Sequence, residues 1–449
     1  MMKRLLLVAA LCLFSNAFAQ NLYFPPLSGA AWETSTPAAL GWRIDKIDTL
    51  YNFLQSRNTK AFIVLQDGKI VLEKYFGTFA RDSVWYWASA GKSVTAFLVG
   101  MAQQEGKLAI SDTTSKYLGA GWTSCPPDKE NKITVWHQLT MTSGLQDNVA
   151  DPYCTLPSCL LYRADAGTRW AYHNAPYTLL DKVIETATGQ TFNAYFAQKM
   201  KARTGMTGLW VKVDYNNLYL SNARSMARFG LLVLNKGVWQ ADTLMRDASY
   251  FNQMTNTSQS LNLSYGYLWW LNGKSSYMLP QTQIVFRRPW APDAPADMIA
   301  ALGKNGQILN VVPSMRLVVV RMGNAPDSAL EVTTVFNNEI WQRLNAVIGT
   351  RTAVETETEA APNHFALSQN YPNPFNPATV IRFHLPANSH VTLKVFDVNG
   401  REVATLIDGN LAPGNHSVVF APRDLAGGIY FYQLTAGQFS QTRKLVLMR

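Results

Sequence analysis

Two short motifs carry residue types that nucleophilic catalysis needs. The first is Ser89-Ala90-Gly91-Lys92, in which a hydroxyl and an amine stand three residues apart. On a helix this spacing places both side chains on one face, about one turn apart. Free N–H groups at a helix start stabilise an oxyanion, and a nearby amine lowers the pKa of a hydroxyl or accepts its proton. The motif therefore predicts Ser89 as a nucleophile assisted by Lys92.

The Ser-x-x-Lys pattern is common by chance, and its competing interpretation is a helix-capping serine followed by a solvated lysine. Gly91-Lys92-Ser93 also suggests a phosphate-binding loop, but that loop needs a glycine five residues before Gly91, where Tyr86 stands. No G-x-S-x-G elbow occurs, which argues against an α/β-hydrolase, and H-E-x-x-H is absent too.

The second motif is Tyr172-His173-Asn174. Together with Ser89 and Lys92 it resembles the serine β-lactamase and penicillin-binding family, which carries S-x-x-K at a helix start and Y-x-N on a helical lobe. The segment 133–145 also resembles the stretch between those motifs, and the likeness covers most of residues 40–345. In the class C, esterase and 6-aminohexanoate-oligomer hydrolase branches, it implies that Tyr172 is a general base working with Lys92. Asn174 would position the substrate carbonyl or Lys92, and His173 would be structural.

A third segment, Gly303-Lys304-Asn305-Gly306-Gln307, stands where that family has a K-T-G-like strand. By resemblance, Lys304 would hold a substrate carboxylate, although a shift of one residue would direct it to solvent. The spacing of Gly303 and Gly306 is equally compatible with the branches of the family that have an aromatic or His-Gly pair in place of K-T-G. The remaining alternative is a plain hairpin turn without a role in binding. Gly306 and Gln307 complete the candidate substrate-binding set, with a backbone N–H near Gln307 as second oxyanion donor. A class A type Glu loop cannot be assigned.

The surrounding elements predict an α+β fold. Asp67-Gly68 is a strong two-residue turn signal between two apolar runs, and three further strands follow near residue 300. Apolar residues at 94, 97, 98 and 101 predict an amphipathic helix that begins near Ser89. We therefore expect an antiparallel sheet built from both ends of this region, flanked by helices, with an all-helical lobe. The predicted strands are 61–65, 70–76, 298–302, 308–312 and 317–321, and further helices are predicted at 177–188 and 222–234.

The C-terminal 85 residues or so read as an all-β, immunoglobulin-like sandwich, because short alternating strands recur at sandwich spacing. The predicted strands are 380–385, 391–396, 403–407, 417–420, 428–434 and 442–447. Segments 371–377, 396–401, 425–431 and 444–447 resemble a type IX secretion C-terminal sorting domain. This resemblance implies a Gram-negative bacterium, passage through periplasm and outer membrane, and secretion or surface attachment.

The chain ends and composition set the organisation. Lys3-Arg4, an apolar stretch and Ala17-Phe18-Ala19 predict a signal peptide over 1–19. Glu and Thr alternate in a predicted linker, 351–363, between a hydrolase domain (20–350) and a sorting domain (364–449). No later segment is apolar enough to span a membrane. The formal charge of +10 is not gathered into a basic block, so we expect no nucleic-acid partner.

Three cysteines remain after the leader, and Cys154 and Cys159 could close a small loop, while any single pairing leaves one thiol over. Only His137 and His173 precede residue 350 and neither lies in a ligand-spaced cluster, so we expect no metal, and no cofactor.

These features predict two-step acyl transfer from Ser89 to water. Aromatic residues around Trp85-Tyr86-Trp87 and Trp269-Trp270 favour a linear amide or ester, including 6-aminohexanoate-like oligomers, over a compact β-lactam. The alternatives are a class C-like β-lactamase, a D-alanyl-D-alanine peptidase, a penicillin-binding sensor that is acylated without turnover, and a surface adhesin on a degenerate scaffold.

Overall fold

The computed structural model describes residues 22–326, 333–349, 365–370, 373–422, 424–437 and 439–448. The predicted signal peptide and the predicted linker lie outside these residues. The main hydrophobic cluster runs from Trp32 to Val347, and a separate cluster runs from Leu367 to Leu447. The described parts on either side of the predicted linker therefore each have their own core.

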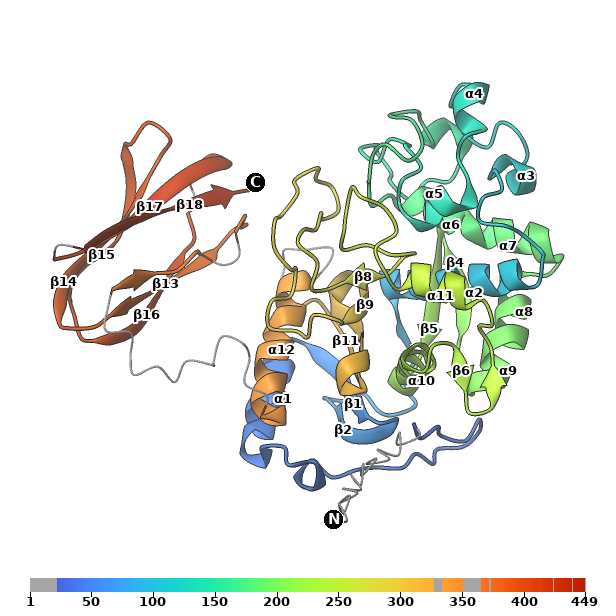
Figure 1. The fold of residues 1–449 in the computed structure, drawn as a ribbon, viewed down its shortest axis with the longest axis horizontal. Helices are drawn as coiled ribbons and strands as arrows, with labels where there is room; N and C mark the ends of the chain where they lie inside the picture. The colour runs from blue at the N-terminus through green and yellow to red at the C-terminus, as the bar shows by residue number, and fades with distance from the viewer. Residues whose placement is uncertain are drawn as a thin grey trace, which may run out of the picture.

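A six-stranded sheet with the order β2-β1-β11-β10-β9-β8 forms the centre of the first part (Figure 1). All its strand pairs are antiparallel, and the N-terminal hairpin lies beside strands from the other end of this part, as the sequence predicts. The strands are β1 (Thr59–Gln66), β2 (Lys69–Tyr75), β8 (Trp270–Leu271), β9 (Ile299–Gly303), β10 (Gln307–Val312) and β11 (Leu317–Gly323).

Helices cover both faces of this sheet. Helix α10 (Ala223–Leu234) packs on β1, β10 and β11, whereas α1 (Ile47–Ser56) packs on β1 and against α12 (Thr334–Ile348); Figure 1 shows them on opposite sides. A Cβ at Gly230 of α10 would lie 2.4 Å from a methyl of Val318, so this glycine lets the helix approach the sheet closely. Burial on both faces explains why β11 begins with a continuous apolar run, 317–320, rather than an alternating pattern.

The helical lobe is formed mainly by the middle of the chain. The predicted helix near Ser89 begins as a 3₁₀ turn, η3 (Ala88–Gly91), and continues as α2 (Lys92–Gln104). The helix predicted at 177–188 begins earlier and is two segments, α6 (Asn174–Thr178) and α7 (Leu180–Thr188). The other helices are α3 (Ser115–Leu118), α4 (Pro127–Glu130), α5 (Val135–Leu139), α8 (Phe192–Phe196), α9 (Ala202–Thr204) and α11 (Ala248–Met254). A small sheet adds β3 (Trp85–Tyr86), β4 (Leu209–Val213) and β5 (Asn216–Ser221), and β6 (Val238–Trp239) pairs with β7 (Asp242–Thr243).

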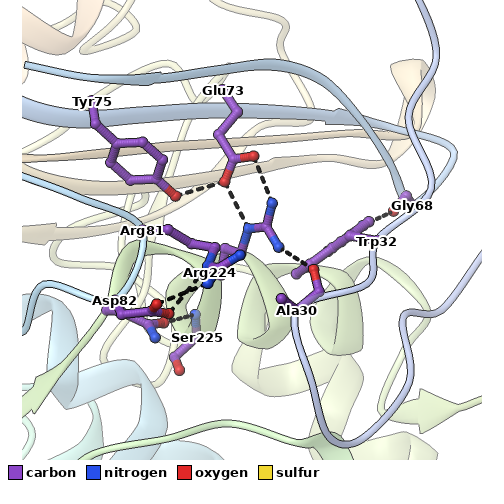
Figure 2. A network of polar contacts seen from close by, with 10 residues as sticks. Ala30, Trp32, Gly68, Glu73, Tyr75, Arg81, Asp82, Arg224 and Ser225 are labelled. Atoms are coloured by element: carbon purple, nitrogen blue, oxygen red, sulfur yellow. Dashed lines mark hydrogen bonds and ion pairs between the residues drawn. The ribbon is translucent and has the colours of Figure 1, made fainter.

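Arg224 of α10 forms an ion pair with Glu73 of β2, and hydrogen bonds around this pair hold the N-terminal segment to the body (Figure 2). The Arg224 guanidinium donates to both carboxylate oxygens of Glu73 at 2.7 Å and to the carbonyl of Ala30 at 2.6 Å. The Trp32 indole donates to the carbonyl of Gly68 at 2.8 Å. Burial raises the pKa of Glu73, but hydrogen bonds from Arg224 and Tyr75 outweigh it and leave that pKa below its ordinary value.

The second part is all-β, as predicted. One sheet has the order β12-β13-β16 and the other the order β15-β14-β17-β18, with apolar side chains of both in one core. The strands are β12 (Ala366–Leu367), β13 (Thr379–Leu385), β14 (Ser389–Phe396), β15 (Glu402–Leu411), β16 (Gly414–Phe420), β17 (Gly428–Ala436) and β18 (Phe439–Leu447).

Cys154 and Cys159 form a disulfide and Cys125 has a free thiol, one of the arrangements that the cysteine count allows. Within the described ranges, every helix is too short or too polar to span a membrane. Across those same residues, no group of three or more His, Cys, Asp or Glu side chains could hold a metal ion.

Candidate active site

Lys92 lies at the centre of the site. Its side chain is at the start of α2, and the residue is only 2% exposed. The ammonium nitrogen lies 2.8 Å from Ser89 Oγ and 2.8 Å from Asn174 Oδ1. It also lies 3.9 Å from the ring centroid of Tyr177 and 4.9 Å from that of Tyr172. The structure thus brings together four predicted site residues: Lys92 of α2, Ser89 of the preceding turn, Asn174 at the start of α6 and Tyr172 in the loop before it.

Ser89 is half-buried on the 3₁₀ turn that precedes α2. Ala88, directly before it, has φ 47°, a left-handed conformation that costs a residue with a Cβ on the order of 1–3 kcal/mol. The flanking Trp87 holds this turn in place, since its indole donates to Ser221 Oγ at 2.7 Å and its backbone N–H donates to the Tyr219 carbonyl. This backbone strain beside the proposed nucleophile is characteristic of functional sites.

Tyr172 is set in a wall of aromatic rings. Its ring stacks on Trp270 with 5.9 Å between centroids and meets Tyr265 edge to face at 6.2 Å. Trp170 adds a further contact at 6.4 Å. Burial raises the pKa of Tyr265 well above its ordinary value, and burial likewise raises that of Tyr177. Both of these neighbouring phenols are therefore neutral, and they surround Tyr172 and Lys92 with apolar surface.

His173 is buried and points to no polar partner. Neither ring nitrogen has a hydrogen bond among the described residues, and burial lowers the pKa of His173 to about 4. The ring is therefore neutral at physiological pH. Its position agrees with the expectation that His173 is structural rather than catalytic.

The third predicted segment is placed differently from the first two. Lys304 is exposed, and its ammonium group makes no hydrogen bond or ion pair with any described residue. Gly306 is a buried residue of the turn between β9 and β10, and the Gln307 side chain donates to the Gly323 carbonyl at 2.7 Å. These contacts do not test a substrate-binding role for Lys304, Gly306 or Gln307, and that role stays a prediction.

Two residues near the site were not among the predicted set. Gly303, at the end of β9, comes so close to the nucleophile segment that a Cβ there would lie 2.4 Å from the Trp87 carbonyl and 3.1 Å from Ala90 N. A glycine inside a strand often marks such a close backbone approach, which is the signal that could have identified it. Tyr177, one turn into the helix after Asn174, gives no comparable sequence signal, because a buried core tyrosine has the same spacing.

The antiparallel sheet, the helical lobe and the Ser89–Lys92–Asn174 cluster between them define a protein of the β-lactamase class. Residues 51–336 match the Beta-lactamase family model, and the chain belongs to that family. Residues 369–448 match the secretion system C-terminal sorting domain, which indicates type IX export and a secreted or cell-surface location.

Among its relatives, the 6-aminohexanoate-dimer hydrolase of Paenarthrobacter ureafaciens is 22% identical over 329 residues, covering 66% of this chain and 81% of that protein. A solved Bacillus anthracis structure, whose name proposes a 6-aminohexanoate-dimer hydrolase, superposes with a TM-score of 0.54 at 18% identity, covering 73% of this chain and 91% of that one. The octameric penicillin-binding protein homologue from Pyrococcus abyssi gives 0.53 at 13% identity, covering 89% and 99%. At these identities the solved structures establish the fold alone.

Proposed function

We propose that this protein is a secreted serine hydrolase that cleaves an ester or amide bond through an acyl-enzyme on Ser89. The observation that carries the proposal is the Lys92 ammonium, held 2.8 Å from both Ser89 Oγ and Asn174 Oδ1 in a buried site. A buried amine in hydrogen-bond reach of a hydroxyl is the arrangement that activates a weak nucleophile.

In the first step, Ser89 Oγ attacks the substrate carbonyl carbon, and its proton passes either to Tyr172 as a phenolate stabilised by the Lys92 ammonium or to Lys92 as a neutral amine. The tetrahedral oxyanion accepts hydrogen bonds from the Ser89 N–H and from backbone N–H groups at the end of β9, which Gly303 brings against the same segment. We place the second donor there because Gln307 pairs with Gly303 in the β9–β10 ladder. When the oxyanion collapses, the leaving alcohol or amine takes the proton, and an ester to Ser89 remains.

In the second step, Tyr172 and Lys92 take a proton from water, the hydroxide attacks the acyl carbon, and Ser89 recovers its proton as the acid leaves. The lysine and tyrosine thus act as base in one half of each step and as acid in the other. Asn174 orients the ammonium through its amide oxygen and leaves its NH₂ group for a substrate carbonyl.

The surroundings favour a substrate without a carboxylate beside the scissile bond. The buried residues of β9 before Gly303 are apolar, Lys304 is exposed, and Tyr172 is backed by Trp170, Tyr265 and Trp270. We therefore infer linear esters or amides, among which 6-aminohexanoate-like oligomers follow the name of the Paenarthrobacter relative. We also propose removal of residues 1–19 before Gln20, a linker at 351–363, and passage through a Gram-negative periplasm and outer membrane.

The test is mass-spectrometric mapping of a fluorophosphonate label in wild type and in Ser89→Ala, followed by rates on esters, 6-aminohexanoate dimers, D-amino-acid peptides and cephalosporins. We expect one label on Ser89 and preferential turnover of esters or linear amides. Faster cephalosporin hydrolysis would favour the class C-like alternative, and faster D-amino-acid peptide cleavage the peptidase. A stoichiometric burst without turnover would indicate a sensor. An unlabelled chain would indicate an adhesin.

A further inference from the structure

Arg321 on β11 is a fully buried arginine, with 0% of the residue exposed. Its guanidinium donates five hydrogen bonds, all to neutral oxygens. Four are backbone carbonyls, of Asn305 at 2.7 Å, Gly306 at 3.0 Å, Arg57 at 2.7 Å and Asn324 at 3.0 Å. The fifth acceptor is Thr59 Oγ1 at 3.1 Å. One side chain thus joins the β9–β10 turn to the start of β1 and to the end of β11.

Burying a guanidinium among neutral acceptors is costly, and burial lowers the pKa of Arg321 to about 9. An apolar side chain of similar volume would fill this space without that desolvation cost. A planar guanidinium can hydrogen-bond several separate carbonyls at once, which an apolar side chain cannot do. The five bonds therefore point to a requirement for a particular backbone position rather than for stability.

The surrounding sequence is fitted to this guanidinium. A Cβ at Gly306 would lie 2.7 Å from Arg321 Nη1, and a Cβ at Gly323 would lie 2.5 Å from Nη2, so neither position accommodates a side chain without a shift. Gln307 adds to the support, since Nε2 donates to the Gly323 carbonyl at 2.7 Å and Oε1 accepts from the Gly323 N–H at 3.2 Å. Gly306, the last residue of the turn, and Gln307, the first residue of β10, are therefore part of the scaffold around Arg321.

The turn that Arg321 holds is in direct contact with the nucleophile segment. Asn305 Nδ2 donates to Tyr86 Oη at 2.7 Å, and Tyr86 lies three residues before Ser89. Gly303, immediately before the turn, packs on the Trp87 carbonyl and Ala90 N, on either side of the nucleophile. A displacement of the turn would therefore change the distance between the end of β9 and Ser89.

We propose that Arg321 is a positioning residue for acyl transfer: through Asn305 and Gly306 it holds the end of β9, with its oxyanion-stabilising N–H groups, at a fixed distance from Ser89. This inference rests on the proposed function. In this proposal Arg321 does not touch the substrate but determines where the end of β9 lies relative to Ser89. An error of about 1 Å in such a placement costs on the order of 100-fold in rate.

The experiment compares Arg321→Lys with Arg228→Lys in the full chain. Arg228 is the matched control, because it is also buried and donates to two carbonyls, those of Thr204 and Pro26, but its bonds lie away from Ser89. Rates are measured on p-nitrophenyl acetate and divided by the concentration of Ser89 titrated with fluorophosphonate, so that loss of folded protein does not count as loss of activity.

We expect Arg321→Lys to lower kcat per titrated site about 10- to 100-fold with little change in KM and an unchanged pH profile, because Lys92 and Tyr172 are intact. Arg228→Lys should lower the melting temperature but leave kcat per site within twofold. Tyr86→Phe, which removes only the hydroxyl that Asn305 contacts, should lower kcat per site by a smaller factor and keeps the test available if Arg321→Lys does not fold.

If the wild type turns over and Arg321→Lys keeps the same kcat per site, the positioning role is overturned and the hydrolase proposal stands. If Arg321→Lys does not fold, an unchanged kcat per site in Tyr86→Phe has the same consequence. An equal loss in Arg228→Lys would also overturn it, because a general loss of packing would then suffice. A wild-type chain that neither labels nor turns over refutes the hydrolase proposal itself, and this inference with it.

Discussion

Replacing Asn174 tests the geometry around Lys92 with one small change. Asn174 is buried, and its Oδ1 accepts a hydrogen bond from the Lys92 ammonium at 2.8 Å. A hydrogen bond to a charged group contributes about 1.5–3 kcal/mol, and each 1.4 kcal/mol is a factor of ten in rate. We therefore expect Asn174→Ala to lower kcat/KM by about 10- to 150-fold.

Asn174→Asp separates electrostatics from packing. A carboxylate at this distance favours the charged form of Lys92 more strongly than the amide does, so the ammonium gives up its proton, and can serve as a base for Ser89, only at a higher pH. We expect Asn174→Asp to lose activity at pH 7 and to recover part of it as the pH rises, whereas Asn174→Ala does not recover.

The assay is the pH–rate profile for p-nitrophenyl acetate hydrolysis, with active sites counted by fluorophosphonate. Asn217→Ala is the matched control, because Asn217 on β5 is also a buried asparagine, and its side-chain amide donates to Asp181. The reasoning about the ammonium would be refuted by an Asn174→Ala enzyme within twofold of wild type, or by an equal loss in Asn217→Ala.

Three further predictions concern other parts of the site. Tyr177→Leu removes the ring whose centroid lies 3.9 Å from the Lys92 ammonium. It should lower kcat about 10- to 30-fold, because a desolvated cation–π contact contributes roughly 2 kcal/mol. Tyr177→Phe keeps the ring and should stay near wild type in the same ester assay. Gly303→Ala places a methyl 2.4 Å from the Trp87 carbonyl, and we expect it to abolish fluorophosphonate labelling while the circular dichroism spectrum stays native. Normal labelling would show that the close approach of Gly303 to Trp87 is not essential. Burial raises the pKa of Asp181 from 3.8 to about 7, so the contribution of this carboxyl to the free energy of unfolding is fully present below about pH 4 and is lost as the pH rises through 7. Asp181→Asn should remove this loss and add up to roughly 4 kcal/mol at pH 8, read from urea midpoints at pH 4.5 and 8.

Much of the fold follows from local sequence signals. Asp67 and Gly68 both have positive φ, as a two-residue hairpin turn requires, so the first two strands could be placed from the sequence. The alternating strands of the C-terminal part are equally plain, since each has one buried face. The break at Leu179 between α6 and α7 could not be placed, because the apolar spacing continues across it.

The site divides in the same way. Ser89 and Lys92 are adjacent on one helix start, so their contact follows from spacing alone, and Asn174 joins them through a recognisable motif. The role of 303–307 could not be settled from sequence, because a one-residue difference in strand register decides whether Lys304 or the glycine before it faces Ser89. Gly303 carries a local signal, a glycine inside a strand, but its partner segment and the contacts of Arg321 are tertiary and no local pattern encodes them.

The central claim is that Ser89 forms a covalent acyl-enzyme. The most direct measurement is rapid acid quenching of wild type and Ser89→Ala during p-nitrophenyl acetate hydrolysis, followed by intact-mass and peptide mass spectrometry. The account predicts one acetyl group on the wild-type chain, located at Ser89, that forms and decays at rates matching turnover and is absent from Ser89→Ala. Steady hydrolysis by Ser89→Ala, or an acetyl group at another residue that turns over at the catalytic rate, would contradict it.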